Sequence, residues 1–292
     1  MKNLLLILFL FFTKILLAQD SILVKERIVI ASILKVRAAP NLKSKVIAKL
    51  PFNTQVEVLN VLNDEQVEGF ELDKEGLVSF WTKIKFQNKI GFVPLCYLSQ
   101  PIEFGQYGVY PSLKAPYWYK IKKSKNGDFL KKIEVKMDFY PKDEVSDGIR
   151  DHVVEIGKID ENEDPMLIAS FQKFREGKIG DFYSECYTDE ENQERCPPNI
   201  NEKKFKNDAR FQNCSIEIQN DSLYFVNGTK KQFLFPQPYC NSYLSWYGDF
   251  DMDNKPDFIL ETSSNMFFFL SSKAKKGDMV KLASHFTICE CD

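Results

Sequence analysis

The chain has 292 residues, of which 39 are Lys or Arg and 41 are Asp or Glu, so its formal net charge is −2. Such mild acidity gives no electrostatic reason to capture a polyanion, and we expect no nucleic-acid partner. The length suits two or three small domains, and 25 Phe and 12 Tyr supply apolar area for more than one core.

The first residues have the composition of a secretory signal peptide. A cationic start at Lys2 precedes an apolar run at 4–12, and the segment ends at Ala18 before polar chain. Lys14 interrupts the apolar character, and the segment is shorter than the roughly 20 residues that a spanning helix needs. We therefore expect a cleaved signal peptide at 1–18 and an exported protein, periplasmic or extracellular, with no membrane span after cleavage.

Short β-type runs broken by turns follow, at 28–30, 45–50, 55–59, 80–85 and 89–93. Strands at this spacing predict a small barrel. Five motifs stand here in a fixed order: Leu34-Lys35-Val36-Arg37 with Pro40, Lys49-Leu50 before Thr54-Gln55-Val56-Glu57-Val58, Trp81-Thr82-Lys83-Ile84, Gly91-Phe92-Val93, and Tyr97-Leu98. Together they resemble the bacterial SH3 domain over residues 27–98, and we place the domain at 24–100.

Two positions depart from the family's usual pattern. Asn53 stands in a turn where the family usually has glycine, and Asn tolerates a positive φ better than most residues. Phe92 stands where the family often has tryptophan. Both substitutions are compatible with the fold, so the resemblance implies a groove that binds a cell-wall peptide or a protein segment.

A second region, 101–238, begins at Pro101, which cannot donate to a continuing strand ladder. Its expected strands lie at 118–121, 132–137, 152–156, 167–171, 214–218 and 222–226. Turn signals separate them: Asn126-Gly127, Asp147-Gly148, Asn220-Asp221 and Asn227-Gly228. No long amphipathic helix is evident, so we expect a predominantly β region.

The last region, 239–292, contains a run of aspartates between two expected strands, 243–247 and 257–262. The carboxylates of Asp249, Asp251, Asp253 and Asp257 occupy the first, third, fifth and ninth positions of the run. The seventh position, Lys255, would contribute its main-chain carbonyl. Oxygen ligands at alternate positions of a curled loop suit calcium. A third apolar run at 266–270 predicts a buried strand, with a short buried helix as the alternative.

The flanking strands decide the class of calcium loop. A helix-loop-helix site needs Gly at its sixth position and a bidentate Glu at its twelfth, but Asn254 and Leu260 stand there. The run instead resembles the aspartate-rich calcium turns of integrin-like FG-GAP repeats, in a single copy, so a repeat propeller is not expected. The resemblance implies a structural calcium that holds the hairpin in register. The alternative interpretation is a solvated polar turn.

Seven cysteines are distributed unevenly along the chain: Cys96, Cys186, Cys196, Cys214, Cys240, Cys289 and Cys291. In an exported protein this pattern predicts disulfide bonds in the second half, with a connectivity that the sequence leaves open. The odd count leaves one thiol, and we expect it to be Cys96, packed as a small buried hydrophobe.

The sequence shows no pairing of a nucleophile with a base that would mark catalytic residues, and its two histidines, His152 and His285, stand in β-type patterns. We therefore expect a mainly β binding protein, with an N-terminal SH3-like small barrel followed by a β-rich C-terminal region that carries a calcium-loop hairpin. The expected partner is a cell-wall peptide or an envelope protein. Two alternatives stay open: a cell-wall hydrolase with its catalytic domain in the middle region, and an inhibitor or assembly partner of another envelope protein. The oligomeric state is also open.

Overall fold

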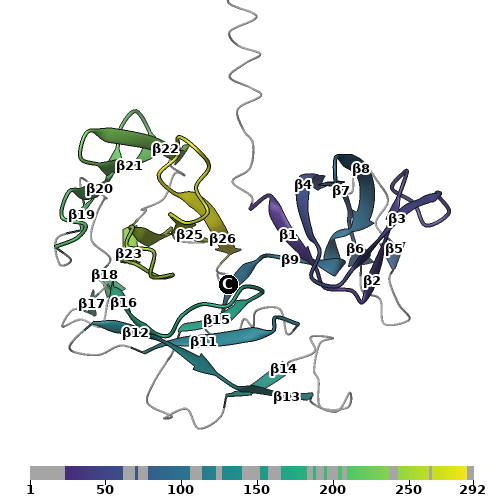
Figure 1. Cartoon of the computed structure of the whole chain (residues 1–292), viewed down its shortest axis with the longest axis horizontal. Coiled ribbons are helices and arrows are strands. Elements are labelled where there is room, and N and C mark those ends of the chain that lie inside the picture. The colour runs from purple at the N-terminus through teal and green to yellow at the C-terminus, as the bar shows by residue number, and fades with distance from the viewer. Residues whose placement is uncertain are drawn as a thin grey trace, which may run out of the picture.

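The computed structural model describes residues 24–61, 70–71, 78–105, 114–122, 127–139, 152–156, 166–182, 187–188, 194–195, 203–205, 209–236, 243–262 and 265–287 (Figure 1). The expected signal peptide lies outside these ranges. Over the described residues the chain is almost entirely β, with one turn of 3-10 helix at Leu95–Tyr97, so the expected fold class is confirmed. In the same residues, no helix has the length and apolar character needed to cross a membrane.

The first sheet has seven strands in the order β3-β2-β8-β7-β4-β1-β9. Their bounds are β1 Glu26–Val29, β2 Ile33–Arg37, β3 Val46–Pro51, β4 Gln55–Val61, β7 Trp81–Phe86, β8 Lys89–Pro94 and β9 Leu98–Ser99. A separate short pair joins β5 Phe70–Glu71 to β6 Val78–Ser79. All five strands expected in this part of the sequence are present, and Asn53 has the positive φ, 64°, that its turn position predicts.

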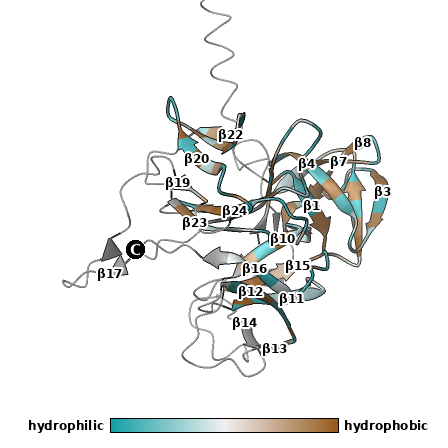
Figure 2. Ribbon diagram, turned by 60° about the vertical axis from the view of Figure 1, so that its left-hand side comes forward, coloured by the Kyte–Doolittle hydropathy of each residue, from teal (hydrophilic) through white to brown (hydrophobic). Residues whose placement is uncertain are grey.

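Alternation of side chains builds the core of this first sheet. In β2, Leu34 and Val36 are buried while Lys35 is exposed, and hydrophobic and hydrophilic residues alternate along several of its strands (Figure 2). The buried residues form one cluster: Val29, Leu34, Val36, Leu50, Val56, Val58, Ile84, Phe86, Val93 and Leu98. A period of two places every second side chain on the same face, so a half-buried sheet needs this pattern.

The second sheet has nine strands in the order β10-β15-β11-β12-β16-β23-β24-β25-β26. Their bounds are β10 Ile102–Gly105, β11 Tyr117–Lys122, β12 Asp128–Ile133, β15 Met166–Ser170, β16 Gly177–Phe182, β23 Tyr243–Gly248, β24 Asp257–Glu261, β25 Asn265–Leu270 and β26 Lys281–Thr287. Strands of the two expected regions, 101–238 and 239–292, therefore share one sheet, joined where β16 pairs with β23.

This sheet curls into a nearly closed barrel, because its end strands β10 and β26 come together. The side-chain amide of Gln100 bridges the seam: Nε2 donates to the carbonyl of His285, and Oε1 accepts the His285 N–H at 2.8 Å. The amide thereby satisfies one donor and one acceptor of an edge strand, as a neighbouring peptide would.

Aromatic and aliphatic side chains fill the barrel. Its interior cluster includes Ile102, Phe104, Tyr119, Ile121, Leu130, Ile168, Trp246, Phe250, Ile259, Phe268 and Leu270. The buried Tyr119 hydroxyl accepts the N–H of Phe174 at 2.8 Å and donates to the carbonyl of the same residue at 3.3 Å. The Tyr119 hydroxyl thus has both a donor and an acceptor partner inside the core.

A four-stranded sheet, β19-β20-β21-β22, covers the outer face of β23–β25. Its strands are β19 Lys203–Lys204, β20 Cys214–Ile218, β21 Ser222–Asn227 and β22 Lys230–Pro236. Contacts include the stacked rings of Phe205 and Tyr247, with centroids 4.6 Å apart. Burial on both faces explains the continuous apolar run of β25, which is a strand and not the alternative helix.

One expected strand of the middle region is corrected. The run 132–137 is divided at Glu134 between β12 and β13 Val135–Phe139. β13 pairs with β14 His152–Ile156, and a further pair joins β17 Tyr187–Thr188 to β18 Glu194–Arg195. A propensity pattern cannot show this break, since it is set by the change of pairing partner from β11 to β14.

Two cysteines lie within the described residues, and both are free thiols: Cys96 is exposed and Cys214 is buried. The expected free thiol of Cys96 is confirmed, but not its burial. Cys214, expected to join a disulfide, instead packs in the core beneath the four-stranded sheet, and burial raises its pKa to about 11. The other five cysteines lie outside the described residues, so the disulfide prediction for them stays open.

Candidate metal centre

The aspartate run forms the loop between β23 and β24, in the hairpin that the sequence predicts. Met252 and Asn254 adopt left-handed backbone conformations, with φ of 60° and 64°, and these two residues curl the loop. At its start the Asp249 N–H donates to the carbonyl of Ile179 in β16 at 2.6 Å. The loop is thus attached to the strand that joins the two halves of the barrel.

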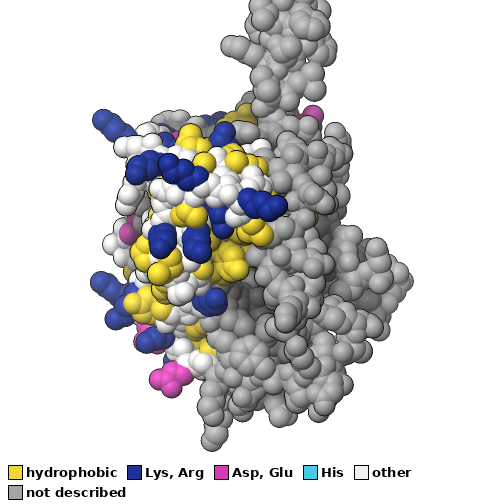
Figure 3. Space-filling view, turned by 90° about the vertical axis from the view of Figure 1, so that its right-hand side faces the viewer, with side chains coloured by type: hydrophobic (Ala, Val, Ile, Leu, Met, Phe, Trp, Pro, Cys, Tyr) yellow, Lys and Arg dark blue, Asp and Glu magenta, His cyan; other side chains and the backbone are white. Residues whose placement is uncertain are grey.

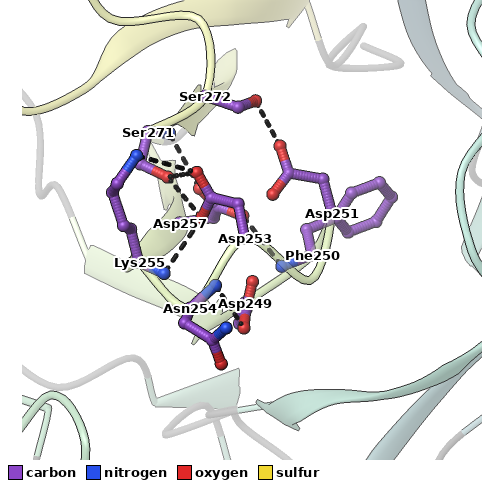
Figure 4. Close-up of polar contacts among 9 residues, drawn as sticks. All are labelled: Asp249, Phe250, Asp251, Asp253, Asn254, Lys255, Asp257, Ser271 and Ser272. Atoms are coloured by element: carbon purple, nitrogen blue, oxygen red, sulfur yellow. Dashed lines mark hydrogen bonds and ion pairs between the residues drawn. The ribbon is translucent and has the colours of Figure 1, made fainter.

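Three of the predicted carboxylates converge. Asp249, Asp251 and Asp257 each place one oxygen within 4.8 Å of the others (Figure 4). Asp249 is 3% exposed and Asp257 is fully buried. Since like charges repel more strongly where water is excluded, this arrangement is costly without a compensating positive group.

Two oxygens in this cluster have no hydrogen-bond partner. Oδ1 of Asp249 and Oδ1 of Asp251 are buried and unpaired among the described residues. Their second oxygens are occupied: Oδ2 of Asp249 accepts from the Asn254 N–H at 3.0 Å, and Oδ2 of Asp251 accepts from the Ser272 hydroxyl. Buried polar atoms are almost always satisfied in folded proteins, and these two oxygens are free to act as ligands of a cation.

Both carboxylate oxygens of Asp257 accept backbone hydrogen bonds. Its Oδ2 accepts the N–H of Phe250 at 2.8 Å, and its Oδ1 accepts the N–H of Ser271, also at 2.8 Å. Ser271 directly follows β25, so Asp257 connects the loop to the next strand as well. Each oxygen has a second lone pair available for a cation.

Burial also shapes the protonation of the cluster. Desolvation raises the pKa of Asp249 and Asp251, and it raises the pKa of Asp257 well above the usual range, with a further contribution from the charge of Asp251. The anionic forms are thus disfavoured in the protein alone. A divalent cation among the three carboxylates would favour them.

Asp253 lies apart from this group. Its Oδ1 accepts from the Lys255 N–H at 2.9 Å and the Ser271 hydroxyl at 3.1 Å, and its Oδ2 pairs with the Lys255 ammonium at 3.2 Å. The structure therefore brings together three of the four predicted carboxylates, while Asp253 and Lys255 contact each other at the rim of the loop (Figure 4).

Three residues around the loop were not anticipated from the sequence: Ser271, Ser272 and Arg210. Arg210 lies 39 residues before Asp249 and pairs with its Oδ2 at 3.1 Å. The two serines lie in the connection between β25 and β26. The spacing of the aspartates shows only local ligands, so residues supplied by other segments leave no signal in that pattern.

A second candidate site is a groove of about 510 Å³ on the first sheet. Trp81 and Tyr97 line it together with Ile33 and Leu42, whose side chains are 61% and 55% exposed. Cations from Lys35, Arg37 and Lys114 also border it. On this face of the molecule, hydrophobic side chains lie among Lys and Arg, with few acidic groups (Figure 3).

The charge of this first domain contrasts with that of the whole chain. Residues 24–61 and 78–100 contain ten Lys or Arg but only two acids, Glu26 and Glu57. The intervening sequence, 62–77, reverses the balance with six acids and one Lys. A positive surface attracts anionic ligands and accelerates their association.

Comparison with known proteins identifies this first domain. Residues 32–99 match the family model of the bacterial SH3 domain. The SH3 resemblance inferred at 27–98 is thus supported, and all residues that line the groove except Ala31 and Lys114 fall within the match. No curated protein and no solved structure gives a significant match to the chain.

Proposed function

We propose that the protein is an exported bacterial envelope protein whose SH3 domain binds a cell-wall peptide or a protein segment. The observation that carries the proposal is the groove of exposed Ile33 and Leu42 bordered by cations, in a domain that matches the bacterial SH3 family. Wall peptides combine apolar methyl groups with free carboxylates, and this groove offers complementary groups for both.

Sedimentation with purified cell walls tests this proposal. The chain without residues 1–18 should sediment with the walls, and replacing both Ile33 and Leu42 by Ser should weaken binding about tenfold, because two exposed apolar contacts are lost. The matched control replaces Leu59 and Ile90, two exposed residues outside the groove, by Ser, and this change should leave wall binding unaltered.

Three results would overturn the wall-binding proposal. The chain could stay in the supernatant, the groove variant could sediment as well as the unmodified chain, or the control variant could lose as much binding. Release of soluble wall fragments would instead favour the hydrolase alternative.

We also propose that the aspartate loop holds one structural calcium ion, with ligands from Asp249, Asp251 and Asp257. The unpaired buried oxygens of Asp249 and Asp251 carry this proposal. The ion would hold the loop against β16 and the β25–β26 connection, which the loop already contacts. Its binding free energy would then add to the stability of the barrel.

Thermal unfolding tests the calcium site. At a calcium concentration about 100 times the Kd, the expected stabilisation is about 2.7 kcal/mol, which for a chain of this size corresponds to several degrees in Tm. Asp251→Ala should abolish the shift, whereas Asp278→Ala, an exposed acid close to the loop, should retain it. Identical melting in calcium and in chelator would contradict the site.

A further inference from the structure

A second cleft, of about 500 Å³, lies directly beside the aspartate loop. Four segments far apart in the sequence line it: 210–211, 225–230, 254–256 and 271–279. Two of these segments are the aspartate loop and the connection that supplies Ser271 and Ser272. The cleft is therefore built by the same elements that surround the candidate metal centre.

Positive charge dominates the lining of this cleft. Five cationic side chains contribute to it, and Asp278 is the one acid among the lining residues: Arg210, Lys230, Lys255, Lys275 and Lys276. A concave surface with one sign of charge concentrates ligands of the opposite sign.

Only part of this positive charge is neutralised internally. Arg210 pairs with Asp249 and Lys255 pairs with Asp253. Lys230, Lys275 and Lys276 are exposed and form no ion pair within the described part of the chain. Three ammonium groups on one cleft are therefore available to contact an anionic ligand.

We propose that this basic cleft binds a ligand with several phosphate or carboxylate groups, such as an anionic oligosaccharide or a phosphodiester-linked polymer. Several groups are needed because the free lysines come from two separate segments, the first residue of β22 and the β25–β26 connection. The exposed amide side chains of Asn227 and Asn254 add uncharged hydrogen-bond donors. This part of the proposal is independent of the metal.

Calcium should strengthen the binding of this ligand. Asp249, Asp251, Asp253 and Asp257 belong to the loop whose residues Asn254 and Lys255 line the cleft, and negative charge on these aspartates opposes an incoming anion. A divalent ion bound to the loop offsets that negative charge. This coupling rests on the proposed calcium site, and by thermodynamic reciprocity the anionic ligand should strengthen calcium binding by the same factor.

Titration of the chain with two oligomers tests the proposal. One probe is a glycerol phosphate oligomer and the other a uronic acid oligomer of equal charge, each measured at low salt in chelator and in calcium. We expect at least one oligomer to bind, and we expect Lys275→Gln with Lys276→Gln to weaken that binding by a factor of about three to ten, because two exposed ionic contacts are lost. The matched control is Lys131→Gln with Lys132→Gln, which removes two exposed charges from β12.

The outcomes separate the cleft from the metal. Absence of binding in both buffers, or equal losses in the two lysine pairs, would overturn the anion site. A rise in affinity of about tenfold in calcium, absent in Asp251→Ala, would support the coupling. Equal affinity in chelator and in calcium would overturn the coupling alone. If calcium did not change the Tm, the metal site would be overturned. Binding of the oligomers in chelator would still test the cleft in that case.

Discussion

At the scale of single residues, His285 occupies the seam of the barrel. Its ring stacks on Phe267 with centroids 4.9 Å apart, and Nε2 lies 2.9 Å from the Asn265 side-chain oxygen. Burial lowers the pKa of His285, and the nearby charge of Arg27 lowers it further. The folded protein therefore holds this imidazole in its neutral form more strongly than the unfolded chain does.

The lowered pKa predicts a pH dependence of stability. As the pH falls below about 6.5, the usual histidine value, the unfolded state takes up a proton that the folded state resists, so the free energy of unfolding decreases. It should decrease less in His285→Gln, which cannot titrate. Urea unfolding at pH 5 and pH 7 measures the difference, and the same decrease in both proteins would show that His285 does not contribute.

At the scale of elements, the pairing of β16 with β23 depends on two glycines. A Cβ on Gly248 would lie 2.0 Å from the Ile179 carbonyl oxygen, and a Cβ on Gly180 would lie 2.5 Å from that of Tyr247. The two paired backbones thus lie so close together at Gly180 and Gly248 that neither position has room for a side chain. This pairing joins the two halves of the barrel and positions the start of the aspartate loop.

Gly248→Ala should therefore destabilise the protein by about 3 kcal/mol, since the added methyl group must displace backbone atoms. Gly228→Ala is the comparison: φ is 60° there, but nothing lies within 4 Å of the added carbon. Its expected cost is only about 1 kcal/mol, from the left-handed conformation. Denaturant unfolding of both variants measures the difference, and equal losses of unfolding free energy would argue against a steric requirement for glycine in the β16–β23 pairing.

Strands with a local signal could be predicted from the sequence. β20 and β21 lie on either side of the expected turn at Asn220-Asp221, and both turn residues adopt a positive φ. β16 was missed, because its glycines and charged residues are typical of a loop and its partner β23 lies some 60 residues away in sequence. The same holds for the residues of the candidate metal site. The aspartates could be predicted from their spacing, whereas Arg210 and Ser271 could not, because the tertiary fold brings them to the loop from other segments.

At the scale of the whole molecule, the SH3 domain and the barrel are in contact. Ile28 of β1 is buried with Trp118, Ala169 and Phe171 of the barrel, and Glu26 pairs with Lys281 of β26. Positive charge also gathers in two places, the SH3 face and the basic cleft, although the chain as a whole is slightly acidic. Both places should attract anionic groups of a ligand, even though the whole chain carries a small negative charge.

Anomalous X-ray diffraction from crystals grown with calcium tests the proposed calcium site of the aspartate loop most directly. We predict one anomalous peak between Asp249, Asp251 and Asp257, with carboxylate oxygens about 2.3–2.6 Å away. A map without a peak there, or with the three carboxylates turned away from one another in the presence of calcium, would contradict the claim.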